Sequence, residues 1–233
     1  MPRRPSPTHF LCLQLASPQL TRNLAEFRAD VTGDNGFGVP ADAVRPPGTL
    51  HLTLGVMSLK PDDIRPTLEV LGRLRPREIL AGLRAADNAP ASTAGSEPGA
   101  RTAGGLSISL RGIHSMTGAS RTSVLYAAPA DAEGLLYSFC RELQKPFRET
   151  GLMEGEDRPL LLHATVVNTV YVRGRGGGRR RERLMLDAGD LMARYDDYVW
   201  AEDMPVSRVA LCRMGAKKVD GDERYEVEGE IEM

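Results

Sequence analysis

LHLTLGVM at residues 50–57 and LLHATVVN at residues 161–168 repeat one pattern of His, Thr and apolar residues. Each stretch holds a His-x-Thr unit followed by an apolar residue: His51 with Thr53, and His163 with Thr165. The alternation of polar and apolar residues predicts a strand in each case. Side chains two residues apart share one face of a strand, so each predicted strand presents an imidazole beside a hydroxyl.

Further strands and helices surround these two motifs in both halves of the chain. Period-two alternation predicts the strands, and apolar residues at helical spacing predict the helices. The predicted strands cover residues 8–15, 49–57, 106–116, 123–128, 160–169, 206–214 and 225–231. The predicted helices begin at residues 18 and 61, with a second piece around residues 79–80, and cover 132–148 and 184–192. If the halves pack about a pseudo-twofold axis, both imidazoles and both hydroxyls converge on one cleft.

The composition is that of a single folded domain. The chain has 233 residues, with 41% hydrophobic and 26% charged residues, and its formal net charge is −1. The composition excludes a wholly disordered or fibrous chain. The net charge excludes an overall positive potential that would attract nucleic acid. Any site for a polyanion must therefore be local.

Cysteine usage and apolar runs indicate where the protein resides. The three cysteines, Cys12, Cys140 and Cys212, form no CxxC pair and no disulfide ladder, which favours a reducing compartment. No apolar run approaches the roughly 20 residues that span a bilayer. We expect an intracellular protein, nuclear or cytoplasmic, without a membrane partner.

The domain is expected to run from residue 8 to residue 219. Residues 1–7 are predicted to be a flexible leader, and residues 87–105 and 173–183 are predicted loops, the second of them rich in Arg and Gly. This second loop could bind phosphates by counterion release, serve as a nuclear-localisation patch, or be a solvated loop. The acidic segment 220–233 could compete with RNA for the arginines or keep the protein soluble.

The paired motifs suit chemistry at a phosphodiester. Free imidazole has a pKa of about 6.5, so near neutrality one His can accept a proton while the other donates one. The hydroxyls of Thr53 and Thr165 can bind the non-bridging phosphate oxygens, whose charge grows towards the transition state. No third ligand is evident for a metal held by His51 and His163, so we expect neither a metal nor another cofactor.

At these motifs the chain resembles the 2H phosphoesterase superfamily. The flanks THFLCLQL, GTLHLTLGVMSL, SVLYA, LLHATVVNT and VALCRMG are similar to the 2′,5′ RNA ligase-like branch that contains the nuclear A-kinase-anchor-protein domain and the activating signal cointegrator phosphoesterase domain. The resemblance implies an α+β fold with two pseudo-symmetric lobes, antiparallel sheets lining a central cleft, and helices outside. It also implies that His51 and His163 are catalytic and that Thr53 and Thr165 bind phosphate.

Residues beside the second motif are candidates for substrate contact. Tyr171 and Asn168 could orient His163 or stack a base, although strand-edge packing explains Tyr171 equally well. Arg173 and Arg175 in the arginine-rich loop could contact phosphates. His9, His114 and Trp200 are expected to have structural roles.

These inferences predict a metal-independent 2H-type phosphodiesterase acting on RNA ends or nucleotides. Hydrolysis of 2′,3′-cyclic phosphates and hydrolysis or ligation of 2′,5′ linkages are both open, because each His can exchange roles in the reverse reaction. Which His is the base also stays open. The first rival is a non-catalytic nucleotide- or RNA-binding module or scaffold subunit of a nuclear complex, and the second is a protein-interaction role of the charged segments. We expect the protein to be a monomer.

Overall fold

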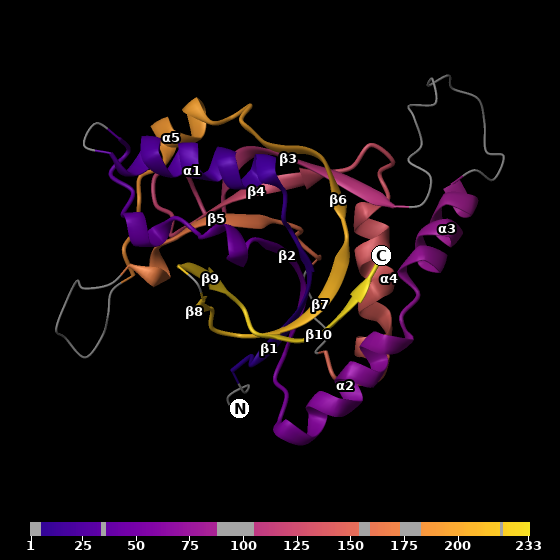
Figure 1. The fold of residues 1–233 in the computed structure, drawn as a ribbon. Coiled ribbons are helices and arrows are strands. Elements are labelled where there is room, and N and C mark those ends of the chain that lie inside the picture. Colours follow the sequence, from indigo (N-terminus) through magenta and orange to yellow (C-terminus); the bar gives the residue numbers. More distant parts are fainter. Residues whose placement is uncertain (1–5, 34–35, 88–104, 154–158, 173–182, 220) are drawn as a thin grey trace.

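A strongly curled antiparallel sheet with helices around it forms the body of the protein (Figure 1). The computed structural model describes residues 6–33, 36–87, 105–153, 159–172, 183–219 and 221–233. Eight strands form the sheet in the order β10-β7-β1-β2-β5-β4-β3-β6. Their bounds are β1 His9–Gln14, β2 His51–Met57, β3 Leu106–Ser115, β4 Val124–Ala130, β5 Ala164–Asn168, β6 Val199–Val206, β7 Arg208–Arg213 and β10 Val227–Glu232.

The pairing of β2 with β5 joins two four-stranded halves at the centre of this sheet. The expected two-lobed α+β fold is therefore confirmed, with the two lobes formed as halves of one continuous sheet. A separate hairpin, β8 Lys217–Val219 and β9 Asp222–Arg224, precedes β10.

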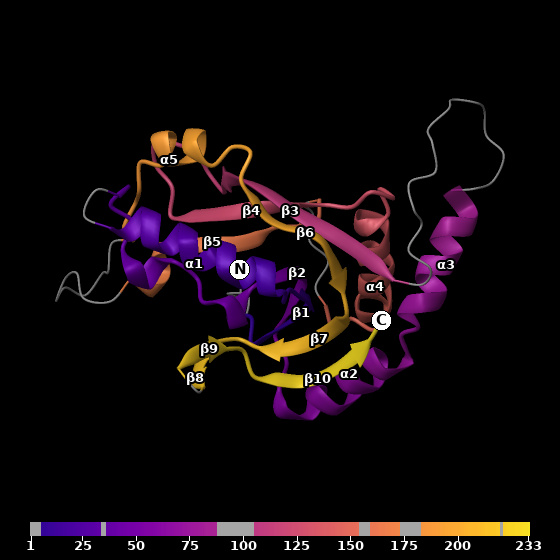
Figure 2. The same cartoon turned by 45° about the horizontal axis from the view of Figure 1, so that its top comes forward.

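The helices lie in two groups beyond the sheet. The helices α2 Pro61–Arg73, α3 Pro76–Asp87 and α4 Leu136–Glu149 lie together on one side, and α1 Pro18–Thr32 and α5 Gly189–Arg194 on the other (Figures 1 and 2). The helix α1 is capped by Ser17, whose side-chain oxygen accepts from the Leu20 backbone N–H at 3.0 Å. Its apolar stripe, like that of α4, packs into the main core.

The second half differs from the sequence prediction in three elements. The predicted strand 206–214 covers the end of β6 and the whole of β7, and most of β6 was not predicted. The second motif strand is shorter than predicted, because β5 begins at Ala164, directly after His163. The helix predicted at 184–192 begins only at Gly189.

The C-terminal acidic segment belongs to the sheet. Its last strand, β10, pairs with β7 along Val227 to Glu232 and forms one edge of the sheet. The acidic side chains meet basic ones from β7: Glu230 pairs with Arg208 at 2.9 Å, and Glu228 with Arg213 at 3.0 Å. In the described part of the chain, no helix has the length and apolar character needed to cross a membrane.

Candidate active site

The two His-x-Thr units meet on neighbouring strands. Leu52 of β2 pairs with Ala164 of β5 in antiparallel register, and both residues are buried. The same register, continued by one residue in each direction, places His51 opposite Thr165 and His163 opposite Thr53. All four side chains then share the face opposite to Leu52 and Ala164. The structure thus brings the predicted quartet together.

The two imidazoles are held in the same way. Nδ1 of His51 lies 2.8 Å from the carbonyl oxygen of Thr49, and Nδ1 of His163 lies 2.9 Å from that of Leu161. A carbonyl oxygen only accepts, so Nδ1 is the protonated nitrogen in both rings. The Nε2 atoms are therefore left to exchange protons with a ligand.

His51 lies in an aromatic setting. The ring of Phe10 is 4.7 Å from its ring, and that of Tyr225 is 5.3 Å away in an edge-on arrangement. Burial lowers the pKa of His51 to about 4, and the nearby His163 and Arg45 act in the same direction, whereas the bond to Thr49 opposes them. His51 is therefore a neutral imidazole at physiological pH.

His163 lies against the aromatic side chains of the other half. The ring of Tyr126 on β4 is 5.4 Å from it, and Tyr126 in turn is 5.5 Å from His114 on β3. Both Tyr126 and His114 line a hollow of about 350 Å³, together with the exposed side chains of Tyr137 and Leu161. Each imidazole thus has aromatic neighbours on its own side of the site.

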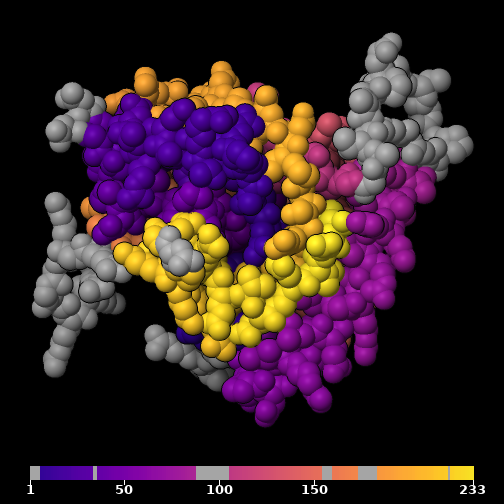
Figure 3. All heavy atoms as spheres, in the orientation of Figure 1, coloured from indigo at the N-terminus to yellow at the C-terminus, as the bar shows by residue number. Residues whose placement is uncertain are grey.

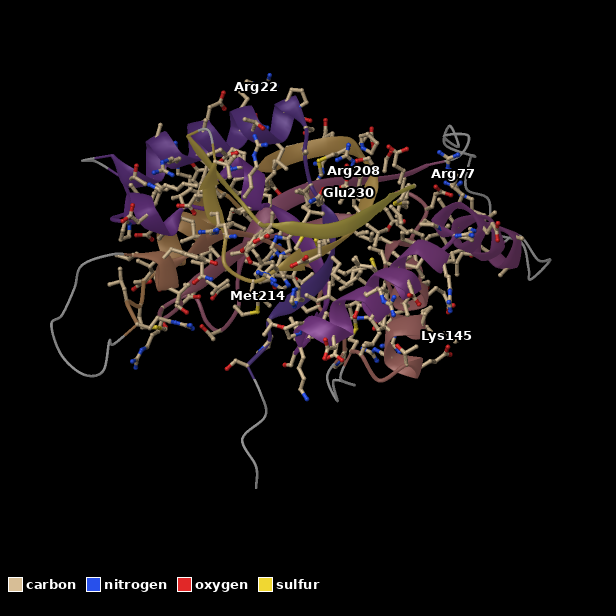
Figure 4. The ribbon with its side chains drawn as sticks, turned by 60° about the horizontal axis from the view of Figure 1, so that its bottom comes forward. Arg22, Arg77, Lys145, Arg208, Met214 and Glu230 are labelled. Atoms are coloured by element: carbon tan, nitrogen blue, oxygen red, sulfur yellow. The ribbon has the colours of Figure 1, made fainter. Side chains whose placement is uncertain are left out.

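A hollow of about 440 Å³ opens over His51. Phe10, Cys12, Cys212 and Tyr225 are among its lining residues. Arg208 and Glu230, seen side by side in Figure 4, form an ion pair at its edge. The surface is recessed between the N-terminal helix, in indigo, and the C-terminal segment, in yellow (Figure 3).

The β8–β9 hairpin positions Tyr225. This hairpin packs so closely on the turn before β2 that a Cβ at Gly48 would lie 2.7 Å from the carbonyl oxygen of Glu223. Only glycine fits this contact, because the neighbouring atom belongs to the backbone. The close approach brings Tyr225, the residue after β9, onto the ring of His51.

A buried arginine completes this side of the site. The guanidinium carbon of Arg45 lies 3.6 Å from the centre of the Tyr171 ring. Arg45 is 4% exposed, and its Nη2 has no hydrogen-bond partner within the described residues. The pKa of Tyr225 is raised, mainly by burial and to a smaller extent by a hydrogen bond with Tyr171. Arg45 lowers this pKa.

The predicted substrate contacts have different outcomes. Tyr171 lies beside Arg45 in a turn after β5 and is 36% exposed. The side-chain oxygen of Asn168 accepts from the Val170 backbone N–H at 3.1 Å, so it caps this turn. Arg173 and Arg175 lie outside the described residues.

Residues expected to be structural have structural contacts. Trp200 is fully buried, and its indole N–H donates to the Gly112 carbonyl at 2.7 Å. His9 is buried, with Nδ1 2.9 Å from the Thr8 hydroxyl. Within the described ranges, no three His, Cys, Asp or Glu side chains gather as metal ligands.

Sequence reasoning missed four neighbours of the quartet: Phe10, Arg45, Tyr126 and Tyr225. Phe10 and Tyr126 lie on predicted strands, but nothing in their local sequence says which strand pairs with a motif. Arg45 comes from a turn, where periodicity carries no signal. Tyr225 was placed at the start of a predicted strand, but it lies in the turn between β9 and β10.

The fold and the paired motifs define a class of protein, the 2H phosphoesterases. Among similar solved structures are a phosphoesterase (TM-score 0.54, 16% identity, 98% of this chain and 99% of that one), a protein of Thermus thermophilus (TM-score 0.55, 16% identity, 97% of both chains) and Escherichia coli LigT in complex with 3′-AMP (TM-score 0.53, 15% identity, 97% of this chain and 98% of that one). At these sequence identities the similarity shows the fold alone.

Residues 7–233 match the family described as the AKAP7 2′5′ RNA ligase-like domain, and the chain belongs to this family. An uncharacterized protein of the fission yeast Schizosaccharomyces pombe is 30% identical over 123 residues. That match covers 52% of this chain and 55% of the yeast protein, so it spans about half the length of this relative.

Proposed function

We propose that this protein is a metal-independent phosphodiesterase that acts on RNA ends or nucleotides. Its substrates in this proposal carry a 2′,3′-cyclic phosphate or a 2′,5′-phosphodiester bond. The observation that supports the proposal is the β2–β5 pairing of Leu52 with Ala164, the residues that stand between the His and the Thr of each motif. A single phosphate can then be reached by an acid, a base and two hydroxyl donors.

His51 is assigned as the general base and His163 as the general acid. A base must be unprotonated, and burial of His51 keeps its pKa at about 4. In hydrolysis of a 2′,3′-cyclic phosphate, Nε2 of His51 takes a proton from the attacking water. Protonated His163 then gives its Nε2 proton to the departing ribose oxygen, so both protons are accounted for.

Thr53 and Thr165 hold the phosphate in this proposal. Both residues are partly buried, and the register places them diagonally across the two strands. They can donate to the non-bridging oxygens, whose negative charge increases in the five-coordinate transition state. The similar fold of LigT, solved with 3′-AMP, supports a nucleotide as the bound group.

The test is replacement of His163 by Ala. We expect turnover of 2′,3′-cyclic and 2′,5′-linked nucleotides to fall by about 10²–10⁴-fold, with nucleotide affinity retained. Replacement of His114, which lies two rings away from His163, by Ala is the matched control and is expected to leave turnover within a few-fold. Unchanged turnover in the His163 variant would contradict the assignment.

The rival function is a nucleotide-binding module without turnover, which the same pocket would serve. If the wild-type protein binds nucleotides but turns over no member of a broad panel of cyclic and 2′,5′-linked substrates, this rival is correct. Metal independence has its own test: EDTA should leave turnover intact, and inhibition that zinc reverses would contradict it.

A further inference from the structure

Two thiols lie side by side on the floor of the hollow over His51. The sulfur atoms of Cys12 on β1 and Cys212 on β7 are 3.8 Å apart, and both residues line the 440 Å³ hollow. Together with Phe10 and Ala210 they form a small buried cluster that is separate from the main core. The proposed mechanism uses neither thiol.

The β1–β2 register places this pair beside the reacting groups. Cys12 is the cross-strand partner of Thr53, and Gln14 is that of His51. Opposite residues in an antiparallel pair share one face, so the Cys12 thiol lies next to the Thr53 hydroxyl. Phe10, from the same cluster, contacts the His51 ring.

The strand register does not favour a disulfide between these cysteines. Cys12 pairs with Ala210, and Cys212 pairs with Phe10, so the two cysteines are diagonal neighbours. Diagonal Cβ atoms lie well beyond the roughly 3.5–4.5 Å that a disulfide requires. The strands would have to shift before the sulfur atoms could bond.

The sulfur separation instead fits a shared ion. Thiolates bind zinc at about 2.3 Å, and two sulfurs 3.8 Å apart would then subtend an angle of roughly 110° at the ion, which is close to tetrahedral. Soft thiolate ligands select ions such as Zn²⁺, Cd²⁺ and Cu⁺. Since no third His, Cys, Asp or Glu joins them among the described residues, water would have to supply the remaining ligands of the ion.

We propose that Cys12 and Cys212 form a dithiolate site for a soft metal ion, and that the bound ion inhibits the enzyme by occupying the floor of the hollow beside Thr53. Binding of a divalent ion releases both thiol protons to solvent.

Cadmium is the probe, because cadmium–thiolate bonds absorb in the ultraviolet. Titration of the reduced full-length protein with Cd²⁺ should produce this band, and both Cys12→Ser and Cys212→Ser should lose it. Cys140 is fully buried on α4 and supplies the matched control, so Cys140→Ser should retain the band. No band in the wild-type protein, or a band that survives in Cys12→Ser, would overturn the site.

A second measurement uses only the wild-type protein, so its result does not depend on whether a cysteine variant folds. Native mass spectrometry of the reduced wild-type protein should show one bound Cd²⁺ together with the loss of two protons, which balances the two thiolates. A protein that stays free of the ion, or a bound ion without this loss of protons, contradicts the proposal. Neither readout depends on turnover, so failure of the proposed function and failure of this site are distinguishable. In an active enzyme, Cd²⁺ should also inhibit the wild type and the Cys140→Ser variant but not the Cys12→Ser variant.

Discussion

The protonation of His51 follows from its neighbours. Phe10 and Tyr225 pack against the ring, while the Thr49 carbonyl fixes the hydrogen on Nδ1. Burial disfavours the charged imidazolium, which is why the pKa of His51 falls to about 4 rather than near 6.5. A histidine in this state can accept a proton throughout the neutral and mildly acidic range.

The acid limb of the pH–rate profile should therefore lie near pH 4. The proposed base is active only while neutral, so kcat/KM should fall as the pH drops through the pKa of His51. Phe10→Leu admits water to the ring, raises this pKa and should move the limb towards about pH 6.5. Phe139→Leu, in the main core, is the control that should leave the limb in place. An acid limb at the same pH in Phe10→Leu as in the wild type would show that burial by Phe10 does not set the pKa of His51.

A bulge in β2 lies within the first motif. On β1, Leu11 pairs with Gly55 and Cys12 with Thr53, which leaves Leu54 without a strand partner. The buried side-chain amide of Gln144 on α4 donates to the Leu54 carbonyl. The helix thus satisfies the backbone group that the bulge frees, and this fixes the strand that holds His51 and Thr53.

Replacement of Gln144 should consequently destabilise the fold. Gln144→Met removes the donor and leaves the buried Leu54 carbonyl unpaired, which should lower the free energy of unfolding by about 1–3 kcal/mol. Glu142→Met, at an exposed position of the same helix, should change it by less than about 0.5 kcal/mol. Urea unfolding of both variants measures the difference. Equal free energies of unfolding for the two variants would mean that the hydrogen bond from Gln144 to Leu54 does not stabilise the bulge.

Sequence patterns predicted some elements much better than others, for physical reasons. The alternation in LHLTLGVM was sufficient for β2, and the Ser17-Pro18 start was sufficient for α1. The strand β6 was missed because AEDMP in its middle combines exposed acids with a proline, and Asp203 has a positive φ of 47°. The exact start of β5 could not be predicted, because the residues before His163 are as apolar as those after it.

At the scale of the whole molecule, the site depends on a pairing between distant parts of the chain. The quartet forms only because β2 and β5 meet at the centre of one sheet, joining the two halves. The matching motifs predicted that these strands converge, and β2 pairs with β5. The aromatic walls and Arg45 could not be predicted, because tertiary packing alone brings those turns to the motifs.

Comparison of His51→Ala, His163→Ala and the double variant shows whether both histidines act at one reaction centre. If both imidazoles act on the same phosphate, kcat for a 2′,3′-cyclic nucleotide should fall by about 10²–10⁴-fold in each single variant, and hardly further in the double variant. Losses that multiply in the double variant, or a single variant with wild-type turnover, would contradict a shared reaction centre.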